Sequence, residues 1–177
     1  FCFTNDSWSQ IIYLTYGPDG QVYMIDWYDK NQCHHGNVGG HDRTNGRIFK
    51  IVYGQPKPVS VDLKKLSDAD LVALHTHPNE WYARHSRRVL QERAAAKKLQ
   101  PETIAQVKKR LADSQVPAQQ LRLLWILHGI EGLAESDLVG LLRHANPDVR
   151  AWTIQLACER GAPSAAILTK FAALAAQ

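Results

Sequence analysis

The first third of this 177-residue chain lacks two residues that favour helices. Residues 1–60 contain no alanine and no glutamate, whereas residues 61–177 contain 20 alanines and 6 glutamates. Ten of the 15 aromatic residues lie within residues 1–54. Aromatic side chains favour strands, and alanine and glutamate favour helices. The composition therefore predicts an α+β fold in which strands and helices are segregated along the chain.

Long apolar runs and cysteines are also scarce. No stretch of about 18 uninterrupted apolar residues occurs, so the sequence predicts no membrane-spanning helix. The three cysteines, Cys2, Cys33 and Cys158, form no CxxC pair, which excludes a zinc ribbon and a c-type haem attachment within this sequence. A Cys2–Cys33 disulfide in an oxidising compartment and a pair of reduced thiols are both compatible with this count.

Three runs with strand character occupy residues 8–16, 21–28 and 47–53. A Gly-Pro-Asp-Gly turn at residues 17–20 joins the first two runs. Simple alternation places Ile11 and Tyr13 on one face, and Ile12 and Leu14 on the other. Because both faces are substantially apolar, each needs cover. The pattern is typical of an incomplete β-propeller blade, which packs between neighbouring blades.

The predicted loop at residues 29–46 contains imidazole, thiol and carboxylate groups, which together could hold a transition metal. We predict no metal site, because the consecutive Cys33, His34 and His35 cannot easily converge on one ion. Turn-capping hydrogen bonds are one alternative role for the loop, and contact with a ligand is another. The candidate ligand-facing residues are His34, His35, Asp42 and Arg43.

A family resemblance rests on the segments YGPDGQVYMIDWYDKNQCHH and HDRTNGRIFKIVYG. They resemble the last propeller blade of the membrane-bound dehydrogenase family of planctomycetes, whose propellers are similar to those of quinoprotein glucose and sorbosone dehydrogenases. The structural motif consists of Asp19, Gly20, Asp26, Trp27, Asp29, Asn45, Gly46 and Arg47. We expect Arg47 to be a structural ion-pair partner, and no catalytic residue can be named.

The resemblance implies several properties of a longer parent protein. It implies upstream propeller blades, an extracytoplasmic location in the periplasm or cell envelope, and oxidation of a sugar or alcohol. The parent would use a PQQ-like quinone with calcium, and a downstream cytochrome segment would carry haem c. The chain starts without methionine, so we expect a fragment that binds no cofactor and is not active by itself.

Helical periodicity begins after a proline-containing linker at residues 55–66. Ser67, followed three residues later by Asp70, is a helix-start signal. Helices are expected near residues 67–75, 80–98, 101–113, 117–128, 135–144, 148–160 and 163–176. The predicted domains are therefore an incomplete propeller part at 1–54 and a helical domain of three to four helix pairs at 67–177.

The helical part also contains an internal repeat. Residues 71–74 resemble residues 138–141, and His77 and Asn79 recur as His144 and Asn146. The same number of residues separates the two members of every match, and we call this separation the repeat offset. Half of the repeat offset is about the length of one helix-pair repeat. The segment HPNEWYARHSRRVLQER also resembles the first HEAT repeat of the same family. The sequence therefore predicts a HEAT-type α-solenoid, whose surface would bind a protein partner or the cytochrome segment.

Three other features of the helical part have competing interpretations. Nine lysines and arginines lie within residues 84–110, which could bind nucleic acid. Solvated helix faces are favoured, because no aromatic stacking platform lies among these cations. His75 and His77 point in nearly opposite directions on a helix, so they are not expected to bind one metal. Trp125 and Trp152 are expected in the core.

Overall fold

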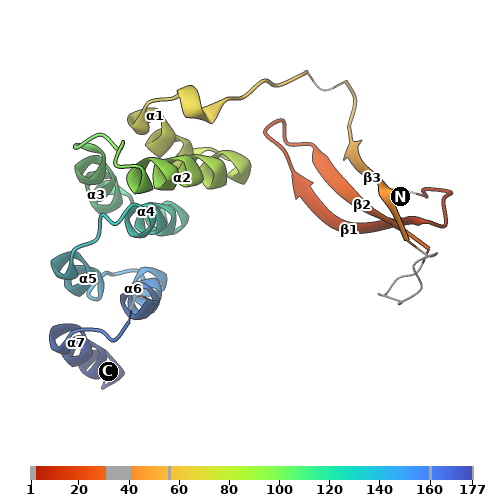
Figure 1. The fold of residues 1–177 in the computed structure, drawn as a ribbon. Helices are drawn as coiled ribbons and strands as arrows, with labels where there is room; N and C mark the ends of the chain where they lie inside the picture. Colours follow the sequence, from red (N-terminus) through yellow and green to blue (C-terminus); the bar gives the residue numbers. More distant parts are fainter. Residues whose placement is uncertain (1–2, 31–40, 56, 160, 177) are drawn as a thin grey trace. The chain divides into compact units, whose positions relative to one another are not determined.

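The structure is a computed structural model that describes residues 3–30, 41–55, 57–159 and 161–176 (Figure 1). The chain divides into two compact units, Phe1–Val61 and Asp62–Gln177. All the strands belong to the first unit and the α-helices to the second, for the residues described. This confirms the predicted α+β composition, with strands first and helices after. None of the described helices has the length and apolar character needed to cross a membrane.

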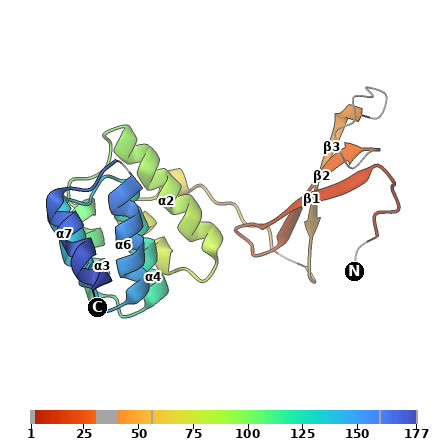
Figure 2. The ribbon, with the colours of Figure 1, turned by 90° about the horizontal axis from the view of Figure 1, so that it is seen from below.

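The first unit contains a three-stranded antiparallel sheet in the order β1–β2–β3 (Figure 2). The strands are β1 (Ser9–Tyr16), β2 (Val22–Asp29) and β3 (His41–Ile51). The predicted turn joins β1 to β2, where the Gly20 amide donates to the Gly17 carbonyl at 3.0 Å. Gly20 adopts a φ of 75°, a conformation that glycine adopts without steric cost.

The predicted alternation along β1 is wrong at one point. Ile11 pairs with Asp26, whereas Tyr13 pairs with Ile25, and the register shifts between them. Since Asp26 and Ile25 are adjacent in β2, their side chains lie on opposite faces of the sheet. Ile11 and Tyr13 therefore also lie on opposite faces, because Ile12 is inserted as a bulge.

The third strand is longer than the sequence indicates. It begins at His41 rather than at Arg47, so the residues before Arg47 that the sequence places in the loop belong to β3. Gly46 pairs with Trp27 and His41 pairs with Asp29, with a second register shift between these pairs. The polar residues of this segment thus continue the ladder, although their composition is typical of a loop.

The sheet has almost no core of its own. Met24 is the only buried apolar residue among those described in this unit. Tyr13, Ile25 and Ile48 form one cross-strand row, and they are 58%, 40% and 76% exposed. On the other face, Leu14 beside Met24 is 59% exposed. Both faces therefore present apolar surface to solvent.

The described part of the second unit contains seven α-helices. They are α1 (Asp68–Ala73), α2 (Glu80–Ala95), α3 (Thr103–Asp113), α4 (Pro117–Gly129), α5 (Glu135–Leu141), α6 (Pro147–Glu159) and α7 (Ala165–Ala175). Two 3-10 turns, η2 (Leu63–Lys65) and η3 (Leu74–Thr76), flank α1. Each α-helix lies close to its predicted position, with ends that differ by a few residues.

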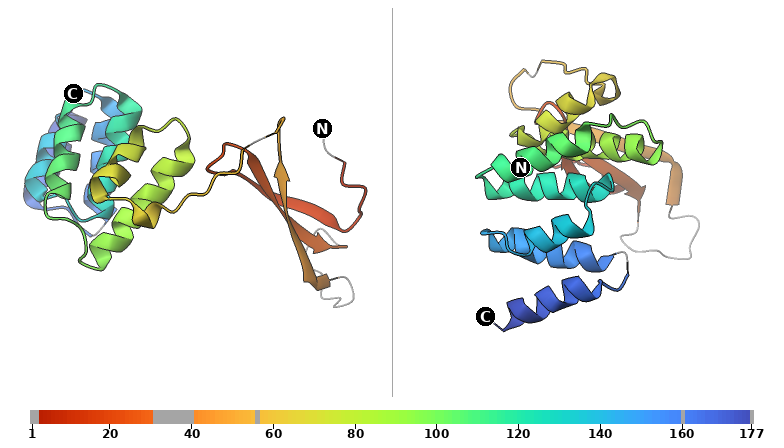
Figure 3. Two further views of the ribbon diagram at one scale, coloured as in Figure 1. Left: turned by 90° about the horizontal axis from the view of Figure 1, so that it is seen from above. Right: turned by 90° about the vertical axis from the view of Figure 1, so that its left-hand side faces the viewer.

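The helices pack in consecutive pairs that form two layers. The pairs are α1 with α2, α3 with α4, and α5 with α6. In one layer α2 contacts α4 and α4 contacts α6, and in the other α1 contacts α3 and α5 contacts α7. Figure 1 shows α3, α5 and α7 along one side of this unit, and Figure 3 shows the helices stacked in chain order. The fully buried core between the layers includes Leu71, Leu90, Val107, Leu124, Ile126, Leu127, Leu142 and Val149.

Local capping explains where these helices begin and end. The Ser67 hydroxyl accepts from the Asp70 amide at 3.1 Å, so α1 starts at the predicted signal. Ser164 caps α7 in the same way. The second helix ends at Ala95 rather than near Lys98, because Lys97 adopts a φ of 55°. The Lys98 amide then donates to the Arg93 carbonyl at 2.8 Å, which closes the last turn.

Candidate functional site

Of the four predicted ligand-facing residues, Asp42 and Arg43 belong to β3. His34 and His35 lie outside the described residues, as do Cys2 and Cys33. Arg43 is part of β3, and the structure describes its backbone alone. Among these four residues, the structure therefore describes side-chain contacts for Asp42.

The Asp42 carboxylate is engaged by its own strand. It accepts from the Thr44 amide at 3.0 Å, the Thr44 hydroxyl at 2.6 Å and the Asn45 side-chain amide at 2.9 Å. The Thr44 hydroxyl contributes most to holding the pKa of Asp42 below its ordinary value. These contacts make a side-chain turn, and they use both carboxylate oxygens.

Arg47 belongs to a polar cluster on the sheet. Its guanidinium forms ion pairs with Asp26 at 2.7 Å and with Asp6 at 3.0 Å. Asp26 is buried and also accepts from the Ser9 hydroxyl and the Gln10 amide. The hydrogen bond to Asp26 is the main cause that raises the pKa of Arg47. This cluster joins β1 to β3 across the buried Asp26 of β2.

The other motif residues also make contacts within the sheet. Asp19, in the turn before β2, forms an ion pair with Lys50 of β3. This hydrogen bond is the largest cause that lowers the pKa of Asp19. Asp29 is buried, and its carboxylate accepts from the Trp27 indole at 3.3 Å. Asp19 thus links the turn to β3, whereas the side-chain contact between Asp29 and Trp27 lies within β2.

The helical unit does not bring its predicted histidines together. His75 is buried in η3, where its Nδ1 lies 3.1 Å from the Leu71 carbonyl oxygen. His77 lies beyond the turn, and His85 stacks on Trp81 with ring centroids 4.1 Å apart. In residues 3–30, 41–55, 57–159 and 161–176, no three His, Cys, Asp or Glu side chains are placed to hold a metal ion.

Part of the predicted basic segment is neutralised by ion pairs. Four of its nine cations have acidic partners: Arg88 with Glu92, Arg93 with Asp68, Lys108 with Asp137, and Lys109 with Asp113. Trp125 and Trp152, predicted in the core, are partly buried and pack against the Leu124 cluster. Their rings meet edge to face, with 5.0 Å between the ring centroids. Arg87 lies over the Trp125 ring at 5.5 Å.

Asp68 connects three elements of the helical unit. Its buried carboxylate receives Arg93 of α2 at 2.5 Å and the Gln100 amide at 2.7 Å. The Thr103 hydroxyl of α3 donates to it at 3.1 Å. Burial alone would raise the pKa of Asp68, but these donors hold it below its ordinary value. The acid therefore fixes α1 against the start of α3.

The internal repeat recurs as a set of hydrogen bonds before α2 and α6. The Asn79 amide donates to His77 Nδ1 at 2.9 Å, and the Trp81 amide donates to the Asn79 side-chain oxygen at 2.9 Å. The Asn146 amide donates to His144 Nδ1 at 3.1 Å in the same way. A further amide, from Asp148, donates to the Asn146 side chain at 2.8 Å. The repeat offset therefore relates two copies of one joint between helices.

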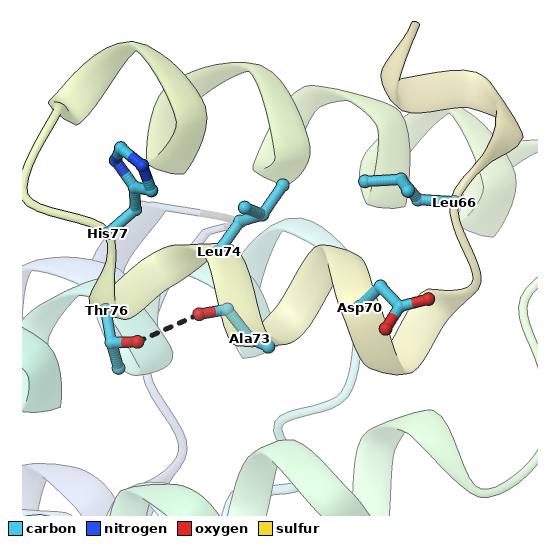
Figure 4. A pocket seen from close by; sticks show the side chains of 6 residues that line it. All are labelled: Leu66, Asp70, Ala73, Leu74, Thr76 and His77. Carbon is cyan, nitrogen blue, oxygen red and sulfur yellow. Dashed lines mark hydrogen bonds between the residues drawn. The ribbon is translucent and has the colours of Figure 1, made fainter. Parts of the chain in front are cut away.

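An open groove lies beside α1, and Figure 4 shows the side chains around it. We call it the α1 groove, and it is lined by Leu66, Asp70, Ala73, Leu74, Thr76 and His77. Its volume is about 370 Å³. Asp70 is exposed at one end of the groove and Leu66 and Leu74 are half-buried, so the groove combines apolar surface with one acid.

The sequence pattern does not single out the α1 groove as a site. In the sequence, Asp70 is a capping signal and Leu74 is part of the repeat. The repeat offset relates Asp70 to Asp137, which Lys108 contacts, whereas Leu66 and Leu74 are half-buried like their counterparts Leu133 and Leu141. Comparisons of the chain with models of protein families, with curated proteins and with solved structures each gave no match.

Proposed function

We propose that the helical unit is a HEAT-type repeat module that docks another protein, and that the sheet unit is one blade of a β-propeller in the same polypeptide. The observation that carries the first part is the repeated joint. His77 and Asn79 make the same contacts as His144 and Asn146, their counterparts at the repeat offset. Stacked helix pairs of this kind commonly present extended binding surfaces.

The two-layer packing supports this proposal. Each helix pair contacts the pair that follows it, through α2, α4 and α6 on one side. Asp137 caps α5 by accepting from the Ala134 amide at 2.7 Å, and Asp70 occupies the equivalent place in α1.

The exposed faces of the sheet support the propeller blade. Tyr13, Ile25 and Ile48 present a cross-strand apolar row on one face, and Leu14 is exposed on the other. A three-stranded sheet with so little buried apolar surface is marginal in water. Neighbouring blades would cover both faces, and the Asp26–Arg47 ion pair would keep the strands in register.

A dehydrogenase activity of the parent protein is a second candidate, and the blade-like sheet supports it. A quinone of the PQQ type with calcium, an extracytoplasmic location and a haem-bearing segment belong to this proposal. Among the described residues no three His, Cys, Asp or Glu side chains gather around one point, and the Asp42 carboxylate is engaged by Thr44 and Asn45. The other blades would supply the cofactor pocket, and His34, His35 and Arg43 are the residues here proposed to face it.

Affinity capture tests the docking role. The complete chain is tagged, incubated with an extract of its source and cross-linked through exposed lysines such as Lys97 and Lys98. We expect one polypeptide in stoichiometric amount, with its cross-links confined to the helical unit. Recovery of no discrete polypeptide would contradict the docking role.

Hydrogen exchange tests the blade. We expect the amides of β1 and β3 to exchange at least about 100-fold more slowly in the complete gene product than in residues 1–177, because neighbouring blades cover the sheet. Equal rates would contradict the blade assignment. A panel of sugars and alcohols with added quinone and calcium tests the dehydrogenase activity. If no member of the panel is oxidised, the dehydrogenase proposal is wrong and only the docking role remains.

A further inference from the structure

We propose that a row of arginine and tryptophan side chains on α2, α4 and α6 binds an acidic segment of a partner protein. The row consists of Arg84, Arg87, Trp125 and Trp152, and we call it the Arg–Trp row. A carboxylate of the segment would contact the arginines, and a nearby apolar side chain would contact the tryptophans. This inference rests on the proposed docking function, and it names the surface that docks and the chemistry of its partner.

Two contacts join the Arg–Trp row across the three helices. The guanidinium carbon of Arg87, on α2, lies over the Trp125 ring of α4, 5.5 Å from the ring centroid. The Trp152 ring of α6 meets the Trp125 ring with 5.0 Å between the centroids. The guanidinium is therefore at most about 11 Å from the Trp152 ring, a distance that about three residues of extended chain span. One short segment can thus reach both ends of the row.

Arg84 and Arg87 are two like charges without an acidic partner. They are three positions apart on α2, so they lie on one face of the helix. Within the part of the chain that the structure describes, no ion pair includes either arginine. Burial lowers the pKa of the Arg87 guanidinium, and the neighbouring Arg84 charge adds to this lowering. A carboxylate bound between the two cations would offset their repulsion.

The acids of the same helices do not neutralise these arginines. Three of the four acids in α2, α4 and α6 lie within ion-pair distance of another basic side chain. The pairs are Glu80 with Arg122, Glu92 with Arg88, and Glu159 with His128. The fourth acid, Asp148, is exposed in the first turn of α6. The Arg–Trp row therefore keeps its positive charge, which an acidic ligand complements.

A partner protein fits the Arg–Trp row better than a nucleic acid does. Strong binding to a duplex relies on several cations that neutralise phosphates, whereas this row has two arginines beside two partly exposed indole rings. Arginine and tryptophan dominate the centres of protein interfaces. The guanidinium group also receives a carboxylate through two parallel hydrogen bonds, so one acidic side chain can be held in a defined orientation.

A displayed library of random short peptides is the probe for the Arg–Trp row. The library is selected on the immobilised complete chain, and an enriched peptide is then labelled with a fluorophore and titrated by anisotropy. We expect the enriched sequences to share an acidic residue and an apolar residue within about three positions of each other. No enrichment, or enriched sequences without this pair, would contradict the proposal.

Two single variants measure the contribution of the arginines. Arg84→Gln should weaken binding of the enriched peptide about twofold to fivefold, because an exposed ion pair is lost. Arg87→Gln should weaken it at least about tenfold, since Arg87 is half-buried and water screens its charge less. Arg110→Gln is the matched control and should leave binding unchanged, because Arg110 is an exposed arginine of α3 outside the row.

A charge exchange makes the test specific. A peptide whose acidic residue is replaced by lysine should bind the Arg84→Glu chain better than the original peptide does, which a loss of folding would not produce. Three outcomes would each overturn the proposal: peptide binding that Arg84→Glu leaves unchanged, duplex DNA that binds the natural chain but not Arg84→Glu, and a chain dimer that Arg84→Glu dissociates. If only the assignment of the row is wrong, a captured partner is retained by Arg84→Glu. If the docking function is wrong, no partner is captured at all.

Discussion

Replacing His75 with leucine tests whether a buried imidazole limits stability in mild acid. His75 is 1% exposed, and its Nε2 has no hydrogen-bond partner among the described residues. Burial, with a smaller contribution from Arg87 and Arg122, lowers its pKa from 6.5 to about 4. Its counterpart at the repeat offset is Leu142, which is also buried. Leucine therefore fits the equivalent site in the second copy.

The pKa difference sets the size and the sign of the effect. Between pH 6.5 and pH 4 the unfolded chain binds a proton at His75 and the folded chain does not, so folding stability falls as the pH falls. A difference of this size corresponds to a loss of about 3 kcal/mol once the pH is below 4. At pH 4.5 the loss is about 2.5 kcal/mol relative to pH 7.5.

Urea unfolding followed by circular dichroism at 222 nm measures this loss. At pH 7.5 the His75→Leu chain should be within about 1 kcal/mol of the natural one. It loses the hydrogen bond to the Leu71 carbonyl and a long contact with the Ser86 hydroxyl, which still bonds the Ala83 carbonyl, and it removes one unpaired nitrogen. At pH 4.5 His75→Leu should be more stable by about 2 kcal/mol or more. His85→Leu, at an exposed histidine, should keep the natural pH dependence.

The comparison between pH values decides the outcome. If His75→Leu loses as much stability as the natural chain between pH 7.5 and pH 4.5, His75 does not remain neutral in the folded state. Asp68 and Asp137 do not confuse this window, because their pKa values are held below 3.8.

Two further sets of variants test the joints of the helical unit. Asp68→Ala should lower the free energy of unfolding by about 3 kcal/mol, because it leaves Arg93 and two other donors without their buried acceptor. A loss under about 1 kcal/mol in urea unfolding would contradict the role of Asp68 in joining α1 to α3. Asn79→Ala and Asn146→Ala should each cost about 1 kcal/mol, the usual value for a lost helix cap. Clearly unequal thermal-unfolding effects would show that the two joints are not equivalent.

The positions of the helices could be predicted because side chains close in the sequence cap their ends. Ser67 and Asn79 each place an acceptor at a helix start, and Pro117 occupies the first position of α4. The end of α2 was less predictable, since Lys97 rather than a glycine adopts the positive φ. Local sequence thus predicts where a helix lies better than it predicts a helix end that has no glycine after it.

The sheet and the α1 groove depend on contacts that a linear pattern does not contain. The bulge at Ile12 comes from pairing with β2, so alternation alone placed Ile11 and Tyr13 on the same face. The early start of β3 at His41 likewise depends on pairing across the sheet. The α1 groove is formed by residues of α1, of η3 and of the chain on either side, which no single sequence motif groups together.

The duplicated joint has a consequence for how this protein can change over time. Each copy is closed by its own histidine and asparagine, which contact backbone amides of the same segment. The position between the histidine and the asparagine differs, with Pro78 in one copy and Ala145 in the other. A unit that carries its own joint can be gained or deleted in one genetic event without redesign of the adjoining helices. Variation in the number of helix pairs among descendants of such a gene would therefore be tolerated more readily than loss of either asparagine.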